Sequence, residues 1–262
     1  MKKSLVLFLW LALALGLPAQ YNLSTPEFLV SMQPSGAAPF SPADLGSLKG
    51  WWVGPDAVST NASNVVFYWP DKSGQARHLT NNYLGRMPFK TNTLNGLSVV
   101  TFGLTNFLYT QFYTNNAEAE WWGVLNFHAL PTGSGILVYG GDAGGTTFQR
   151  ITHNSFNSWY SQGANLTSAP GWWAFTDRWV IYMWKWGNLF FLLKTNNVQC
   201  IVGNAGSSGA GPGGLMLNTD RTTAGSGYAC KWAELIFYNK TNTVAHATKV
   251  YQYLKTKWGT SP

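Results

Sequence analysis

Formal charge is scarce in this chain. Only 10% of its 262 residues are Asp, Glu, Lys or Arg, whereas 45% are hydrophobic. A disordered chain combines low hydrophobicity with high charge, so this composition excludes one. The net charge is +7, but the basic residues are scattered singly and form no run. Because a nucleic-acid-binding protein usually carries a basic patch or stripe, nucleic acid is not the expected partner.

Several chemical signatures are also missing. The chain has no G-x-S-x-G elbow, no P-loop and no dinucleotide fingerprint. Its four histidines, His78, His128, His153 and His246, lie far apart and show no metal-ligand spacing. We therefore expect no metal centre and no cofactor. Asp142, in a Gly-rich stretch, is a candidate calcium ligand, but calcium takes roughly six to eight oxygens and a turn residue is the favoured interpretation.

Cysteine is scarce as well, with two residues, Cys200 and Cys230. In an exported protein an even pair favours one disulfide, and two buried free thiols are the alternative. The bridge would tie together the base of a Gly-rich stretch, 203–214, which has the composition of a long surface loop.

Long apolar runs are limited to the N-terminus. Lys2 and Lys3 precede the apolar run Leu5–Leu17, and Ala19 is a small residue suited to signal cleavage. We predict a signal peptide over 1–19 and a Pro/Ser/Gly-rich leader over 20–40. The apolar run is too short for a comfortable membrane span, so no stable span is expected after cleavage. The alternatives are an uncleaved anchor or a hydrophobic strand. The predicted location is extracellular or at the cell surface.

Aromatic residues and glycine are abundant, with 14 Trp, 12 Tyr, 15 Phe and 28 Gly. Aromatic residues favour strands and glycine favours the turns between them, so the composition predicts an all-β fold. One helix is expected at 243–258, with Asn242 as its cap and Gly259 at its end. The predicted strands are Leu48–Val53, Val65–Trp69, Leu97–Phe102, Phe107–Phe112, Trp121–Phe127, Trp179–Trp186, Leu189–Leu193, Cys200–Val202 and Trp232–Tyr238.

Two parts of the chain resemble the LamG-like, concanavalin A-type jelly-roll family. The first comprises Leu48–Trp52, the W-x-D-x-S-G turn in Trp69–Gly74, and the N-G-x-x-x-V-x-F strand in Leu94–Phe102. The second comprises the A-E-L strand in Trp232–Asn239 and the Y-L-x-x-K-W-G end of the helix in Tyr253–Gly259. The resemblance implies a two-sheet antiparallel jelly-roll sandwich over 41–262 with a C-terminal helix. It also implies a role in carbohydrate or protein recognition, adhesion, or the structure of a virion or appendage.

Asp71, the Asn95-Gly96 pair and Glu234 lie within these motifs, and we interpret all of them as structural. Asp71 can accept backbone N–H groups in a tight turn, and Asn-Gly favours a turn ahead of a strand. Glu234 lies on an apolar strand, where a buried carboxylate is expected to hydrogen-bond to backbone or to a neighbouring strand.

Because glucanases share the implied fold, the acidic residues are candidate catalytic groups. Glu118 and Glu120 are two apart, so on a strand they share one face at roughly 6.5–7 Å. Paired carboxylates at such a separation suit glycoside hydrolysis. The glucanase signature E-x-D-x-E requires a third carboxylate, however, and Trp122 and Asn116 occupy the neighbouring positions. The favoured interpretation is that the two glutamates form the charged, solvent-exposed start of a strand. The pair is kept as the fallback catalytic site.

Candidate ligand-binding residues are aromatic side chains beside polar ones, because sugars offer flat C–H faces and hydroxyl groups. Asn157, Trp159 and Tyr160 form one such group, and Trp172 and Trp173 form a second. Neighbouring strand residues face opposite ways, so one member of each adjacent Trp pair should lie outside the core. Burial of both in a core is the alternative.

These observations favour a non-catalytic, exported recognition or adhesion module that binds a glycan or a cell-surface protein. The second hypothesis is a structural subunit of a virion, fibre or appendage, with homo-oligomeric or other assembly contacts. A glycoside hydrolase of the same fold is third. An exposed aromatic groove would favour recognition, and flat apolar edges would favour assembly.

Overall fold

The computed structural model describes residues 38–59, 63–81, 86–110, 118–128, 135–141, 148–153, 158–162, 166–170, 177–187, 190–203, 215–218 and 227–260. One compact unit extends from Phe40 to Pro262. The expected signal peptide and almost all of the expected leader lie outside the described residues. Within those residues, no helix has the length and apolar character needed to cross a membrane.

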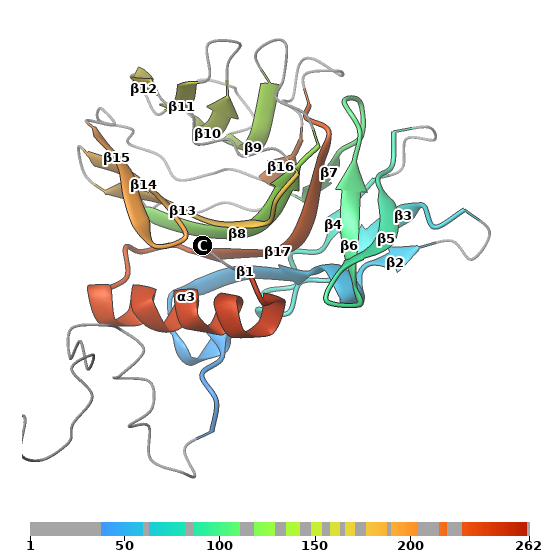
Figure 1. The fold of residues 1–262 in the computed structure, drawn as a ribbon, viewed down its shortest axis with the longest axis horizontal. Helices are drawn as coiled ribbons and strands as arrows, with labels where there is room; N and C mark the ends of the chain where they lie inside the picture. The colour runs from blue at the N-terminus through green and yellow to red at the C-terminus, as the bar shows by residue number, and fades with distance from the viewer. Residues whose placement is uncertain are drawn as a thin grey trace, which may run out of the picture. The chain divides into compact units, whose positions relative to one another are not determined.

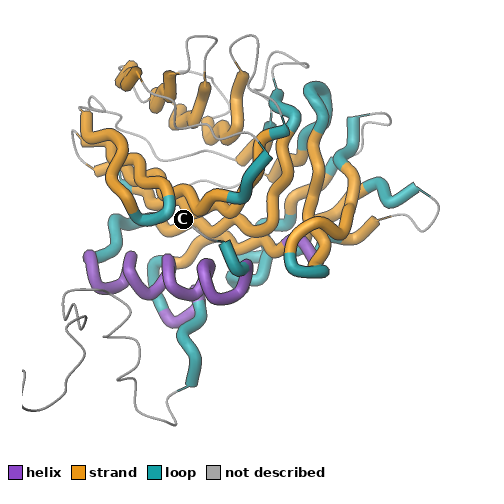
Figure 2. The backbone as a smooth tube through the Cα atoms, in the orientation of Figure 1, coloured by secondary structure: helices purple, strands orange, loops and turns teal. Residues whose placement is uncertain are grey.

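The unit is mostly β, with two antiparallel sheets and one C-terminal helix (Figures 1 and 2). Sheet A has eight strands in the order β15-β14-β13-β8-β17-β6-β5, and β1 pairs with β17 beyond the end of β6. Its strands are β1 (Leu48–Val53), β5 (Phe89–Leu94), β6 (Leu97–Phe102), β8 (Ala119–Phe127), β13 (Val180–Gly187), β14 (Phe190–Thr195), β15 (Val198–Gly203) and β17 (Cys230–Tyr238).

Sheet B has nine strands in the order β12-β11-β10-β9-β16-β7-β4-β3-β2. Neighbours in this order are antiparallel but often distant in sequence, since β16 lies between β9 and β7. Its strands are β2 (Val58–Ser59), β3 (Val66–Trp69), β4 (Leu79–Thr80), β7 (Leu108–Thr110), β9 (Gly135–Gly141), β10 (Phe148–His153), β11 (Ser158–Gln162), β12 (Leu166–Pro170) and β16 (Leu215–Leu217).

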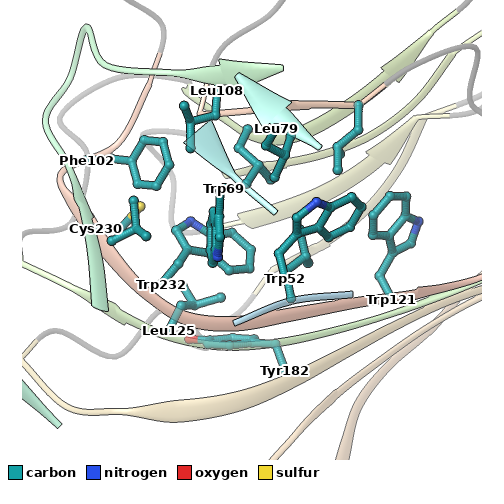
Figure 3. Packing of buried hydrophobic residues seen from close by; sticks show 14 of the residues in the cluster. Trp52, Trp69, Leu79, Phe102, Leu108, Trp121, Leu125, Tyr182, Cys230 and Trp232 are labelled. Atoms are coloured by element: carbon teal, nitrogen blue, oxygen red, sulfur yellow. The ribbon is translucent and has the colours of Figure 1, made fainter. Parts of the chain in front are cut away.

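An aromatic core lies between the two sheets (Figure 3). Trp52, Trp121 and Trp232 enter it from sheet A, and Trp69 enters it from sheet B. Close packing of these rings requires a small residue among them. Gly123 fills that position, because a Cβ atom there would lie 2.7 Å from Cζ3 of Trp232.

A second core lies on the other face of sheet A, beneath the helix α3 (Val244–Trp258) (Figure 1). Val250, Leu254 and Trp258 recur along the helix and are fully buried against that face. Sheet A is therefore covered on both sides. This second core explains why a strand such as β8 is buried along its whole length rather than at alternate positions.

The ends of the elements follow local sequence signals. Ser41 and Asp44 form a capping box around the 3-10 helix η1 (Pro42–Asp44). Gly259 ends α3 with a φ of 60°, in agreement with the sequence. The N-cap, however, is Thr243, whose side chain accepts from the His246 N–H. The prediction of Asn242 as cap is wrong by one residue, because Asn242 binds Glu120 instead.

The two predicted motif turns are confirmed. Asn95 and Gly96 both have positive φ angles, 49° and 71°, and join β5 to β6. The Asn95 side chain also donates to the carbonyl of Trp258, which attaches this turn to the end of α3. Asp71 accepts the backbone N–H groups of Trp51, Ser73 and Arg77.

Candidate functional site

Both members of the Glu118–Glu120 pair contact the segment that leads into α3. Glu118 is exposed, and its Oε2 accepts from the backbone N–H and hydroxyl of Thr241. Glu120 is fully buried on β8. Its Oε1 accepts from Nε1 of Trp122 at 2.7 Å, and the Asn242 backbone and side chain donate to its two oxygens at 2.9 Å.

Lys185 completes this cluster. Its ammonium lies 3.6 Å from Oε2 of Glu120 and donates to the Asn242 carbonyl at 2.7 Å. The Glu120 carboxylate therefore already has donors on both oxygens and no solvent exposure. The expectation of a solvent-exposed strand start holds for Glu118 but is wrong for Glu120, which attaches the start of α3 to sheet A.

Glu234 forms the second buried carboxylate cluster. It lies on β17, is fully buried and accepts four hydrogen bonds. Trp51 Nε1 and the Tyr253 hydroxyl donate to Oε1 at 2.6 and 2.9 Å, and Lys257 Nζ and Trp258 Nε1 donate to Oε2 at 2.7 Å each. The structural interpretation of Glu234 is confirmed, but its partners are side chains of β1 and α3 rather than backbone.

These buried carboxylates affect neighbouring tyrosines. Burial, and then the negative charge of Glu234, raises the pKa of the Tyr253 hydroxyl far above its ordinary value. Burial, followed by the charges of Glu120 and Glu234, raises the pKa of Tyr238 in the same way. Both hydroxyls therefore stay protonated and remain hydrogen-bond donors in the folded protein.

Neither of the two described pairs of adjacent tryptophans marks an exposed surface. Trp121 belongs to the core between the sheets and Trp122 to the core beneath α3, and both are buried. The prediction that one member of this pair lies outside a core is wrong, because α3 covers the second face. Trp52 is buried, and Trp51 is half-buried but bonded to Glu234.

The outer face of sheet B has a different character. Tyr68 on β3 pairs with Thr80 on β4, which pairs with Tyr109 on β7, which in turn pairs with Met216 on β16. All four side chains are half-buried. Directly paired residues share one face of a sheet, so these residues form a continuous row across four strands. The register continues the row to Tyr139 on β9. We call these five residues the tyrosine row.

The alternate positions of the same strands face the core. Trp69, Leu79, Leu108 and Leu217 are all fully buried. The tyrosine row is therefore on the side of sheet B that faces away from sheet A. Aromatic neighbours support two of its rings: His78 lies 5.0 Å from the Tyr68 ring centroid, and Phe107 lies 6.3 Å from that of Tyr109.

Most of the predicted ligand-binding residues lie outside the part of the chain that the structure describes. Asn157, Trp172, Trp173 and Asp142 lie outside the described residues. The backbone of β11 pairs Trp159 with His153 and Tyr160 with Thr152. Neighbouring strand residues belong to opposite faces, and the register from β9 to β11 assigns Tyr160 to the face of the tyrosine row and Trp159 to the other.

The expected disulfide does not form in this structure. Cys230 carries a free, fully buried thiol. Its strand, β17, is four steps from β15, the strand of Cys200. Adjacent strands are ~4.8 Å apart, which separates the two strands by about 19 Å, far beyond disulfide reach. The alternative of unpaired thiols thus describes Cys230, whose pKa is raised by burial.

Within the described parts of the chain, no three His, Cys, Asp or Glu side chains gather as metal ligands would. Asp142, the candidate calcium ligand, is outside those parts.

Comparison with known proteins shows similarity of fold. No protein-family profile and no curated protein matches the sequence. Among solved structures, the chain is similar to Trypanosoma rangeli sialidase in complex with sialic acid, with 12% identity and a TM-score of 0.59 over 87% of this chain and 35% of the sialidase. It thus spans about a third of that protein's length.

Two further structures are similar at low identity. The binding domain of Paraclostridial Mosquitocidal Protein 1 is 8% identical, with a TM-score of 0.60 over 82% of this chain and 53% of that one. A mutant GH54 α-L-arabinofuranosidase soaked with 4-nitrophenyl α-L-arabinofuranoside is 14% identical, with a TM-score of 0.56 over 74% of this chain and 51% of that one. At such identities the likeness concerns the fold alone.

Proposed function

We propose that this protein is an exported, non-catalytic recognition or adhesion module of the concanavalin A-like jelly-roll type, and that it binds carbohydrate on the outer face of sheet B. The observation that carries the proposal is the tyrosine row. It offers half-buried aromatic side chains with Thr80 among them, on a sheet face that α3 does not cover. Carbohydrate sites combine such an apolar lining with a few polar groups.

The contacts of the three described glutamates support binding over hydrolysis. Glycoside hydrolysis needs two carboxyl groups that reach the substrate. Glu120 and Glu234 are fully buried and hydrogen-bonded to the scaffold, and Glu118 is bonded to Thr241. Each of these groups stabilises the attachment of α3 to sheet A instead of facing the tyrosine row.

The names of the neighbours agree with a glycan partner. A sialidase bound to sialic acid and an arabinofuranosidase soaked with an arabinofuranoside act on sugars, and the mosquitocidal fragment is a binding domain. The residues predicted from the sequence stay in the proposal as candidate ligand contacts: Asn157, Trp159, Tyr160, Trp172, Trp173 and Asp142.

A glycan array tests the proposal. The purified chain is compared with a Tyr68→Ala/Tyr109→Ala variant and a Trp172→Ala/Trp173→Ala variant. Phe40→Ala is the matched control, since Phe40 is also half-buried but packs beside Tyr253 of α3. We expect the parent and the control to bind the same glycans and the tyrosine variant to lose them. A folded parent that binds no glycan contradicts the proposal.

A further inference from the structure

We propose that the ligand of the tyrosine row is a single, extended, neutral β-1,4-linked polysaccharide chain that crosses the strands of sheet B. This inference rests on the proposed function and adds a substrate class to it. It is carried by the spacing of the tyrosines, by the charge of sheet B, and by the twist that a sheet imposes on such a row.

The tyrosines recur on every second strand. Along the sheet order β3-β4-β7-β16-β9, Tyr68, Tyr109 and Tyr139 are each separated by one intervening strand. Adjacent strands are ~4.8 Å apart, so successive tyrosine positions are about 9.6 Å apart. In an extended β-1,4-linked chain each sugar is rotated by about half a turn from the last, and the same ring face recurs every second sugar at a comparable spacing. One chain can therefore place equivalent sugars over Tyr68 and Tyr109, and the same repeat reaches the register position of Tyr139.

The charge of sheet B selects a neutral chain. Its nine strands contain no Asp or Glu, and Arg150 is their single Lys or Arg. Sheet A, by contrast, carries Glu120, Glu234, Lys185 and Lys231, among others. The strands of the described part of the row, β3, β4, β7 and β16, contain no Asp, Glu, Lys or Arg, and Arg150 on β10 lies beyond its register partner Tyr139 at the end of the row. An acidic polysaccharide would lose hydration over these four strands without gaining cationic partners there, which is costly. A neutral chain avoids that cost and can use Thr80 for hydrogen bonds.

The two described rings are held in place before any ligand binds. Nδ1 of His78 accepts the backbone N–H of Asp71 at 3.1 Å, which fixes the imidazole that packs against Tyr68. Phe107 lies beside Tyr109, and its carbonyl accepts from the buried Asn81 side chain at 2.7 Å. Such support reduces the ordering cost of binding, which strengthens affinity.

The sheet geometry favours one chain over a crystalline surface. Adjacent strands of a sheet rotate by roughly 20–25°, so tyrosines two strands apart are turned by about 40–50° relative to each other. A flat crystal face cannot follow that rotation, whereas a single soluble chain can twist with it. We therefore expect soluble oligosaccharides to bind and crystalline cellulose or chitin to be poor ligands.

Isothermal titration calorimetry with cellohexaose, chitohexaose and mannohexaose provides the test. We expect at least one of them to bind, with affinity that rises from the disaccharide to the hexasaccharide as more tyrosines are engaged. Tyr68→Ala and Tyr109→Ala should each weaken binding roughly five- to tenfold, in keeping with the loss of one ring contact. Tyr68→Phe should retain most of the affinity, and Phe40→Ala should bind like the parent.

The outcomes distinguish a wrong substrate class from a wrong proposed function. Binding that is restricted to sialylated, branched or uronate-containing glycans on the array would overturn the substrate class and leave the proposed function standing. Hexasaccharide binding that both tyrosine variants retain, with unchanged circular dichroism, would also overturn it. A folded parent that binds no glycan in either experiment overturns both proposals.

Discussion

The most informative single change is at Glu234, whose carboxylate joins β1, β17 and α3. Glu234→Ala would leave three N–H donors and one hydroxyl without their acceptor. Removing one partner of a buried ion pair costs about 3–5 kcal/mol. The side chain of Lys257 is 25% exposed, so its ammonium can partly rehydrate, and the lower part of that range applies. We therefore expect a loss of about 3–4 kcal/mol, a large part of the ~5–15 kcal/mol that stabilises a typical domain.

Glu234→Gln is the variant to measure first, because it keeps the size of the side chain. The amide nitrogen of the glutamine would replace one carboxylate oxygen and would face a hydrogen-bond donor instead of accepting from it. We therefore expect the free energy of unfolding to fall by about 2–3 kcal/mol, the cost of leaving one or two buried donors without an acceptor. Urea unfolding followed by tryptophan fluorescence gives the value, provided that the denaturant slope is unchanged. The control is Glu118→Gln, an exposed carboxylate expected to change stability by no more than ~0.5 kcal/mol.

A double-mutant cycle with Lys257→Met sharpens this test. If the pair is coupled, the Lys257 substitution should destabilise the parent more than it destabilises the Glu234→Gln variant. A Glu234→Gln loss below ~1 kcal/mol would refute the reasoning, because each stranded buried donor alone is worth about that much. A cycle with no coupling would refute the role assigned to the ion pair.

Three further predictions concern the cores and their titratable groups. Gly123→Ala should cost ~1–3 kcal/mol by overpacking the aromatic core, whereas Gly46→Ala, with no atom within 4 Å of the new Cβ, should be nearly neutral in the same urea assay. The raised pKa of Tyr253 stabilises the fold below about pH 10, its unfolded value, and this contribution is lost as pH rises above it. Unfolding free energies at about pH 9 and about pH 11 should therefore differ less in Tyr253→Phe than in the parent. In a Cys200→Ser background the buried Cys230 thiol should resist iodoacetamide until urea unfolds the chain, and rapid native labelling would contradict its burial.

Much of sheet A could be predicted from the sequence. Leu48–Val53 and Leu97–Phe102 are strands with the predicted bounds, and α3 begins one residue after its predicted start. These segments combine dense aliphatic or aromatic residues with Gly, Asn or Pro at their ends, so local preference and tertiary packing agree. Asn95-Gly96 is the clearest case, because its positive φ angles suit the turn and its side chain reaches α3.

Most of sheet B was not predicted, because only β3 and β7 overlap predicted strands. The strand β9 contains the apolar run Ile136–Tyr139 between glycines, a strand signal that was missed, whereas the sequences of β10–β12, Phe148–His153, Ser158–Gln162 and Leu166–Pro170, are mostly polar or small. Such strands form where neighbouring strands supply hydrogen-bond partners along the sheet, which is a tertiary property. The sequence windows of β10–β12 do not carry that signal.

The role of Glu120 was misjudged for a related reason. Spacing correctly indicates that Glu118 and Glu120 lie close along one strand, and it favours a solvated face for both. The two-residue spacing carries no information about where α3 packs. Once the helix covers the face, the same spacing directs Glu118 and Glu120 at Thr241 and Asn242, the residues that lead into the helix.

The tyrosine row shows most clearly how a proposed site can leave no signal in the sequence and yet follow from the order of strands in the structure. Tyr68, Tyr109 and Tyr139 are far apart in the chain, and each alone resembles an ordinary strand aromatic. They become a row only because β16, from the C-terminal part, pairs between β7 and β9, and β4 pairs between β3 and β7. Strand order thus sets the tyrosine spacing, and that spacing rather than the aromatic content predicts which glycan should bind.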